Sequence, residues 1–326
     1  MQRTNTQLTT TRSLGSDRVA NLERRRATGR SVNGPLLVAL EERHPIDGAL
    51  HLAQVLARRD QVNAHLLAIV RPLAFPPALV AADDLAAIEQ GRLQQARDGA
   101  RQALHRAHGI ATYWSTEAVL GGSASVLARV ARERGSALTI VGMALPHAPE
   151  RMACEDAALQ IVRKSQIPVL AVPASTDRLP RRAIVAVDFS PPSRRAAAMA
   201  LTLLRSRGTL TLAHVQPDVD FAALGRPGLD AIYASGRDAL LQELETELRK
   251  QIGDASDVTV DTLVLHGDAS ETLLGRAREG SYDLIAAGTA GLAAPEVHDM
   301  MGSVSSALVR GAACAVLVAP GAEISP

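Results

Sequence analysis

Two stretches of this chain repeat the same pattern 145 to 147 residues apart. The first reads LLVALEERHPIDGALHLAQVLARRDQVNAHLLAIVRP and the second reads AIVAVDFSPPSRRAAAMALTLLRSRGTLTLAHVQP. Each contains an apolar run, a loop, a helical pattern and a second apolar run that ends in Val-x-Pro. Further on, VLGGSAS from Val119 matches VLHGDAS from Val264, and Pro173 matches Pro320. Offsets this constant indicate tandem copies of one structural unit.

The repeat divides the chain into two units of similar size. We expect the first unit at residues 33–173 and the second at 183–322, joined by the polar, proline-bearing linker 174–182. Domains of roughly 150 residues are large enough to bury a core of their own. Residues 1–32 precede both units and carry seven arginines but only two acidic side chains. Because they also lack apolar periodicity, we expect them to form a disordered basic tail.

Short apolar runs of Val, Ile, Leu and Ala in the second unit are typical of buried parallel strands. The predicted strands are Ala183–Val187, Leu210–Val215, Val258–Leu265, Leu284–Ala287 and Ala315–Ala319. Helical patterns fall between them: Ser190 is placed to cap the first and Gly208 to end it, Leu229–Ile252 forms the second, and Ser270 begins the third. Strands that alternate with helices pair in parallel through right-handed crossovers. The fold class is therefore α/β.

Glycines mark the passage from the fourth strand of the second unit to its last helix. The strand is predicted to end at Gly288, the loop carries Gly291, and Gly302-Ser303 opens a helical pattern. At a helix start the backbone N–H groups have no acceptor within the helix, and the helix dipole favours an anion. Two interpretations stay open: an anion site, or glycines that only form a tight turn and a helix start.

The spacing of these glycines resembles that of the universal stress protein family, in the subset that binds ATP. That subset carries G-x-x-G, nine residues and then G-[ST]. Here Gly288-Thr289-Ala290-Gly291 supplies the first part and Gly302-Ser303 the last, with a spacer of ten residues from Leu292 to Met301. The resemblance covers about residues 33–322. It implies two tandem Rossmann-like units of the adenine nucleotide alpha hydrolase type, each an open five-stranded parallel sheet of order 3-2-1-4-5 flanked by helices.

The resemblance also implies a nucleotide site in the second unit. Ligands of open parallel sheets bind at the carboxyl ends of the strands where the strand order reverses, which should bring Asp188 and Gly288 together. In ATP-binding relatives the residue matching Asp188 lies by the adenosine, the backbone at the position of Val215 lines the base pocket, and the glycine loop binds ribose and phosphates. The candidate cofactor-binding residues are Asp188, Ser190, Val215, Gly288, Thr289, Gly291, Gly302, Ser303 and Val304. The implied cofactor is ATP or AMP, with or without Mg²⁺; alternatively, Asp188 is a turn residue at a helix start and Val215 is simple core.

The first unit departs from this pattern. Glu41 stands where the second unit has Asp188, and Gly142-Met143-Ala144-Leu145 lacks the second glycine of the loop. The next helix should open with Cys154-Glu155-Asp156-Ala157 in place of Gly-Ser. Acidic residues at a helix start complement its dipole and repel phosphate. We therefore expect no ATP in the first unit, which would have a structural role.

Catalytic sequence motifs are lacking, so we expect a protein that is not an enzyme. Slow ATP hydrolysis is the alternative, and no dedicated residues support it. The nine histidines are scattered: His214 falls inside a strand as a core residue, and His266 and His298 lie near the predicted site. Cys154 and Cys314 lie in different halves at no metal-ligand spacing. Aromatic residues are 2% of the chain, too few for nucleic-acid binding by base stacking. Without a secretory signal or an apolar run of ~18–20 residues, we expect a cytoplasmic protein with no membrane contact.

Two functions follow from the resemblance. The first is a stress-response regulator that holds an adenine nucleotide in the second unit and acts through an unidentified protein partner. The alternative is a nucleotide-free scaffold with two vestigial pockets that acts by dimerisation. Val169–Val172 and Val316–Ala319 are apolar edge strands that need covering. We expect the two units to cover each other as a pseudo-dimer within the chain, or two chains to form a homodimer.

Overall fold

The structure is a computed structural model. It describes residues 30–41, 46–73, 75, 81–106, 114–143, 151–216, 218–219, 223, 226, 228–253, 257–289 and 302–321, with the backbone alone for 151–157.

The first unit alternates strands and helices as its apolar runs predict. Its strands are β1 (Leu36–Glu41), β2 (Ala64–Val70), β3 (Trp114–Leu120), β4 (Leu138–Met143) and β5 (Val169–Pro173). Its helices are α2 (Asp47–Asp60), α3 (Ala82–Arg106), α4 (Ser123–Glu133) and α5 (Arg151–Lys164).

The second unit repeats the same order. Its strands are β6 (Arg182–Ala186), β7 (Thr209–Gln216), β8 (Thr259–His266), β9 (Leu284–Gly288) and β10 (Ala315–Ala319). Its helices are α6 (Pro191–Leu203), α7 (Leu229–Ile252), α8 (Ala269–Glu279) and α9 (Ser303–Gly311). All five strands lie within one residue of their predicted positions, and β10 and α7 match them at both ends.

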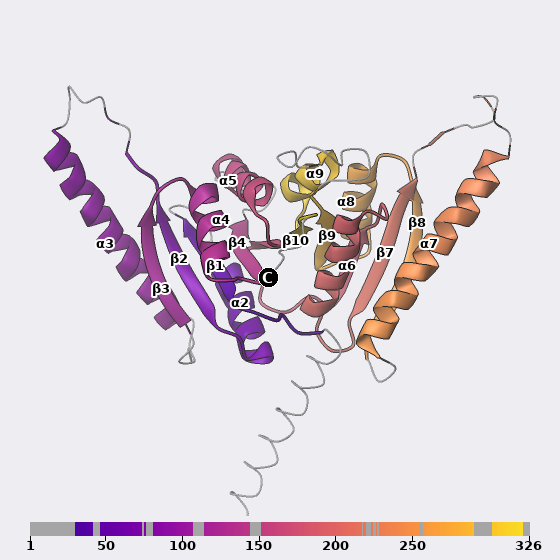
Figure 1. The fold of residues 1–326 in the computed structure, drawn as a ribbon, viewed down its shortest axis with the longest axis horizontal. Coiled ribbons are helices and arrows are strands. Elements are labelled where there is room, and N and C mark those ends of the chain that lie inside the picture. The colour runs from indigo at the N-terminus through magenta and orange to yellow at the C-terminus, as the bar shows by residue number, and fades with distance from the viewer. Residues whose placement is uncertain are drawn as a thin grey trace, which may run out of the picture.

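The strands form one continuous sheet of order β3-β2-β1-β4-β5-β10-β9-β6-β7-β8. Within each unit the order is 3-2-1-4-5 and every pairing is parallel, as the resemblance implied. The two sheets are not separate, however, because β5 and β10 pair antiparallel, with Leu170 opposite Leu317. Each of these strands covers the unpaired edge of the other. Figure 1 shows the two units on either side of this joint, with α3 and α7 as the outermost helices.

The sheet is covered on both faces, because alternate side chains of each strand point to opposite sides. On one face Leu36 and Val38 join a buried cluster with apolar residues of α2, α3, α6 and α7. On the other face Leu37 and Ala39 join a cluster with α4, α5, α8 and α9. No helix in the described part of the chain combines the length and apolar character needed to span a membrane.

The last residues before the first unit pack against the fold. Arg30, Ser31 and Val32 are buried. Arg30 Nη1 lies 2.9 Å from Asp257 Oδ1, in the second unit, and Val32 N donates to Asp60 Oδ2 at 3.0 Å. The rest of the expected tail, residues 1–29, lies outside the described residues.

Candidate functional site

The strand order of the second unit reverses between β6 and β9, and the candidate residues gather at the carboxyl ends of these strands. Asp188 follows β6 and accepts hydrogen bonds through Oδ1 from Ser190 N at 3.1 Å and Ser190 Oγ at 2.5 Å. Ser190 is the N-cap of α6, and its Oγ accepts from Ser193 N at 3.4 Å. Asp188 therefore orders the turn into α6, as its turn-residue interpretation requires.

Gly288 brings the end of β9 against the start of α6. A Cβ placed on Gly288 would lie 2.6 Å from Pro192 Cβ and 2.9 Å from the Pro192 carbonyl carbon. Only a glycine allows this approach without moving the helix. The expected meeting of the Asp188 turn with Gly288 is observed.

The start of α9 also lies against the end of β9. Gly302 N donates to Thr289 O at 2.5 Å, and Ser305 Oγ lies 3.4 Å from the same oxygen. Gly302 is the N-cap of α9; its first turn, with Ser303 and Val304, has no side-chain cap and no acidic residue. Gly291 and His298 lie outside the described residues.

The helices that begin at this edge differ in how their first amides are used. Ser190 caps α6, Asp268 caps α8, and α7 has Asp230 in its first turn. Among these described helix starts, that of α9 alone has neither a side-chain cap nor an acidic side chain in its first turn. The helix dipole there is positioned to favour an anion.

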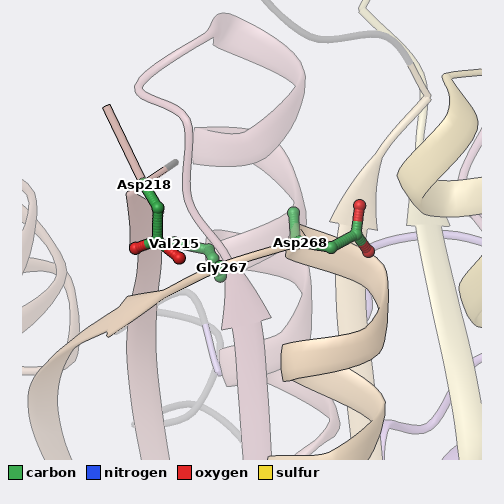
Figure 2. Close-up of a pocket in the computed structure, with 5 residues that line it drawn as sticks. Val215, Asp218, Gly267 and Asp268 are labelled. Atoms are coloured by element: carbon green, nitrogen blue, oxygen red, sulfur yellow. The ribbon is translucent and has the colours of Figure 1, made fainter. Parts of the chain in front are cut away.

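Val215 lies beside a surface pocket of about 440 Å³, at the carboxyl ends of β7 and β8. The pocket is lined by Val215, Asp218, Gly267, Asp268 and Ala269. Figure 2 shows the Asp218 side chain over Val215 and Gly267, whereas the Asp268 carboxylate is turned toward α8. Asp268 accepts hydrogen bonds from Ser270 and Glu271, which hold the pKa of its carboxyl below the ordinary value.

Asp218 and the Gly267–Ala269 segment were not among the candidate residues predicted from the sequence. The Gly-Asp-Ala-Ser stretch after β8 could have predicted the start of α8 at Asp268, because aspartate is a strong N-cap residue. Gly267 adopts φ +111°, which favours glycine. His266 Nδ1 lies 4.0 Å from Asp218 Oδ1, and both side chains are exposed.

His214 is a core residue, as its position in a strand predicted. Its Nδ1 lies 2.8 Å from Val187 O and its Nε2 lies 3.0 Å from the Tyr233 hydroxyl. Its ring stacks on Phe189, with centroids 5.0 Å apart. These contacts tie β7 to the turn after β6 and to the N-terminal half of α7.

The corresponding place in the first unit has different chemistry. Glu41 at the end of β1 is buried, and Arg71 Nη2 lies 3.4 Å from its Oε2. Glu155 and Asp156 were expected at the start of the next helix. This prediction was wrong, because helix α5 begins at Arg151 and the two acidic residues lie one turn inside it. Ala144 and Leu145 lie outside the described residues.

Within the described residues, no cluster of three or more His, Cys, Asp or Glu side chains is placed to hold a metal ion.

Comparison with known proteins agrees with the sheet topology. The profile of the universal stress protein family matches residues 33–173 and again residues 180–320. A universal stress protein from Archaeoglobus fulgidus superposes with a TM-score of 0.59 at 17% sequence identity, over 89% of this chain and 97% of that chain. A functionally unknown protein from Pseudomonas aeruginosa superposes with a TM-score of 0.53 at 18% identity, over 90% and 94%. No curated protein matches the sequence.

The two structural likenesses, both under 25% identical, show a shared fold. The family profile covers both halves of the chain, with residue ranges that follow the repeat. The chain therefore belongs to the universal stress protein family and carries two copies of its domain in tandem.

Proposed function

We propose that this protein is a stress-response regulator whose second unit binds one adenine nucleotide. Membership of the family, with two tandem domains, supports a role in stress response. The nucleotide, ATP or AMP with or without Mg²⁺, would lie at the carboxyl ends of β6 and β9. Its occupancy would change a surface that a partner protein recognises.

The observation that carries this proposal is the meeting of three segments at the strand-order reversal. The Asp188 turn, the Gly288-Thr289 strand end and the Gly302-Ser303 helix start lie against one another through the contacts of Gly288 with Pro192 and of Gly302 with Thr289. In this arrangement Ser303 and Val304 would present backbone N–H groups to phosphates, while the Gly302 N–H stays bonded to Thr289 O. Val215, at the neighbouring pocket, would line the base.

The proposed role is regulatory binding. Fast hydrolysis of ATP needs groups that hold Mg²⁺ and orient a water molecule toward the γ-phosphate. Where the Asp188 turn, the end of β9 and the start of α9 meet, the described carboxylate is that of Asp188, and it already accepts two hydrogen bonds from Ser190. The same two bonds favour the second candidate function, a nucleotide-free scaffold, because Asp188 then serves only the turn.

Native mass spectrometry of the protein distinguishes the two functions. It would be recorded after purification without nucleotide, and again after ATP and Mg²⁺ are added. The test variant is Gly302→Asp: aspartate is a good N-cap residue and Gly302 has φ −58°, so the helix should form normally. Its carboxylate would repel a phosphate at the start of α9. Gly122→Asp is the matched control, since Gly122 caps α4 of the first unit, also without a side-chain cap.

One nucleotide per chain, lost in Gly302→Asp and kept in Gly122→Asp, is the expected result. Two per chain would contradict the proposal that the first unit binds none. No bound nucleotide at millimolar ATP would reject the regulator and favour the scaffold.

A further inference from the structure

A serine, a histidine and a glutamate are in contact near the amino ends of β2 and β3, in the first unit. His65 of β2 is paired in register with Ser115 of β3. Glu117 is two residues further along β3, so it shares a face of the sheet with Ser115. The Ser115 Oγ lies 2.8 Å from His65 Nδ1, and Glu117 Oε2 lies 3.4 Å from His65 Nε2.

The histidine is buried under an exposed serine. His65 is 4% exposed, whereas Ser115 is open to solvent. The Glu117 contact is too long for a strong hydrogen bond and is mainly electrostatic; such contacts are often loose before a substrate binds. Arg134 Nη2 lies 3.0 Å from the same Glu117 oxygen.

These surroundings keep the imidazole neutral. Burial, and then the positive charge of Arg134, lower the pKa of His65 to about 4, although Glu117 acts in the opposite direction. A neutral imidazole has a free electron pair on one nitrogen and a hydrogen on the other. At neutral pH, Nδ1 can accept the Ser115 hydroxyl proton while Nε2–H faces Glu117.

His65 and Ser115 line a pocket of about 440 Å³, which is large enough for a small ester. The pocket is lined by Pro35, Asn63, Ala64, His65, Trp114, Ser115 and Arg134. Trp114 and Pro35 give it an apolar wall. Arg134 and Asn63 are its polar donors, and a guanidinium can stabilise negative charge on a carbonyl oxygen.

The fold itself does not require this arrangement. Leu36 pairs with Ala64 as Ala183 pairs with Leu210, so Thr211 corresponds to His65 and its register partner Asp261 corresponds to Ser115. Thr211 Oγ1 instead lies 3.1 Å from the Tyr282 hydroxyl. The second unit thus keeps the same strands without a serine, histidine and acid in contact.

We propose that Ser115 is the nucleophile of an esterase site for small carboxylic esters, with His65 as its general base. Ser115 Oγ attacks the ester carbonyl carbon as its proton passes to His65 Nδ1. The bond from the carbonyl carbon to the alkoxy oxygen then breaks, and the alcohol leaves with the proton from His65. A water molecule, deprotonated by the same nitrogen, attacks the acyl-serine; the bond from the acyl carbon to Ser115 Oγ breaks, Ser115 Oγ takes the proton back from His65, and the carboxylic acid is released. Glu117 is a positioning residue, whose negative charge attracts the other ring nitrogen across 3.4 Å.

This activity lies outside the nucleotide site and departs from the expectation that the chain is not an enzyme. Known sequence motifs describe nucleophiles on loops and helices, whereas these three residues come from neighbouring strands. The Ser115–His65 distance meets the hydrogen-bond criterion for an activated serine. Glu117 acts on the base through its charge, because His65 Nε2 has no hydrogen-bond partner among the described residues.

The first experiment uses the wild-type chain and needs no variant. The protein would be treated with a fluorophosphonate, which phosphonylates activated serine hydroxyls, and the adduct would be mapped by peptide mass spectrometry. We expect one adduct, on Ser115, formed at a rate that stays constant between pH 7 and pH 5. No adduct on Ser115 would overturn the proposal. A rate that halves near pH 6.5 would show that the base is a histidine of ordinary pKa and not the buried His65, whose pKa is lowered to about 4.

The second experiment measures hydrolysis of p-nitrophenyl acetate above the buffer rate. Ser115→Ala and His65→Gln should each lower kcat/KM at least about 100-fold, a general-base contribution of ordinary size. Glu117→Gln should lower kcat and leave KM unchanged, because the carboxylate contacts the imidazole and not the substrate. Ser125→Ala, which removes an exposed serine of α4, should change neither constant. Equal hydrolysis by the wild type and Ser115→Ala would refute the proposal.

Discussion

Acid should destabilise the first unit through His65. In the folded protein the pKa of His65 is lowered from 6.5 to about 4 by burial and by Arg134. As the pH falls below 6.5 the unfolded chain takes up a proton on this side chain, while the folded chain does so only near pH 4. The stability that depends on a neutral His65 is therefore complete above pH 6.5 and is lost progressively as the pH falls toward 4.

The size of this loss follows from the two pKa values. Each unit of difference is worth about 1.4 kcal/mol, so the full effect is about 3 kcal/mol. Between pH 7 and pH 5 the loss should be about 2 kcal/mol, because the folded histidine is still neutral at pH 5. His65 is 4% exposed, so solvent screens its charge little.

Urea unfolding at pH 7 and pH 5, for the wild type and His65→Gln, measures this effect. Trp114, the only tryptophan of the chain, lines the same pocket as His65, and its fluorescence reports on the first unit. Between the two pH values, the wild type should lose about 2 kcal/mol more of its free energy of unfolding than the variant does. Other titrating groups cancel in this difference. Equal losses in both proteins would show that protonation of His65 does not cause the acid destabilisation.

Two further predictions concern close packing and the joint between the units. Gly288→Ala should lower the free energy of unfolding by about 1 to 3 kcal/mol, because its Cβ would meet Pro192, whereas Gly275→Ala, in open space within α8, should raise it by up to about 1 kcal/mol. Chemical denaturation measures both, and equal effects of the two substitutions would contradict the close contact at Gly288. Light scattering should give a monomer of 34.3 kDa, because β5 and β10 cover each other's edges. A mass twice as large would show that two chains associate.

Local features were readable from the sequence to a large extent. The strand β10 and the helix α7 were predicted with the right ends, because apolar runs and helical periodicity are properties of consecutive residues. The Asp188-Ser190-Pro191 turn was readable for the same reason, since a cap acts on amides two or three residues away.

The end of α6 shows where local reasoning stops. Gly208 was expected to end this helix, but it ends at Leu203. Arg59 of the first unit donates to Thr202 O at 2.8 Å and to Leu204 O at 3.4 Å, and Arg205 N donates to Pro180 O at 2.9 Å. Arg59, which is distant in the sequence, donates hydrogen bonds to the carbonyl groups at the end of α6. The end of this helix therefore depends on tertiary contacts.

The repeat and the apolar runs of the sequence predicted a tandem α/β protein, and they predicted that Asp188 and Gly288 meet at one edge of the sheet. The pairing of β5 with β10 into one sheet, and the contacts of His65 with Ser115 and Glu117, became visible only in the folded structure. The physical reason is the same in both cases. Which strand edges pair, and in which register, depends on hydrogen bonds between segments that no local pattern relates, and a shift of one residue would turn these side chains to opposite faces.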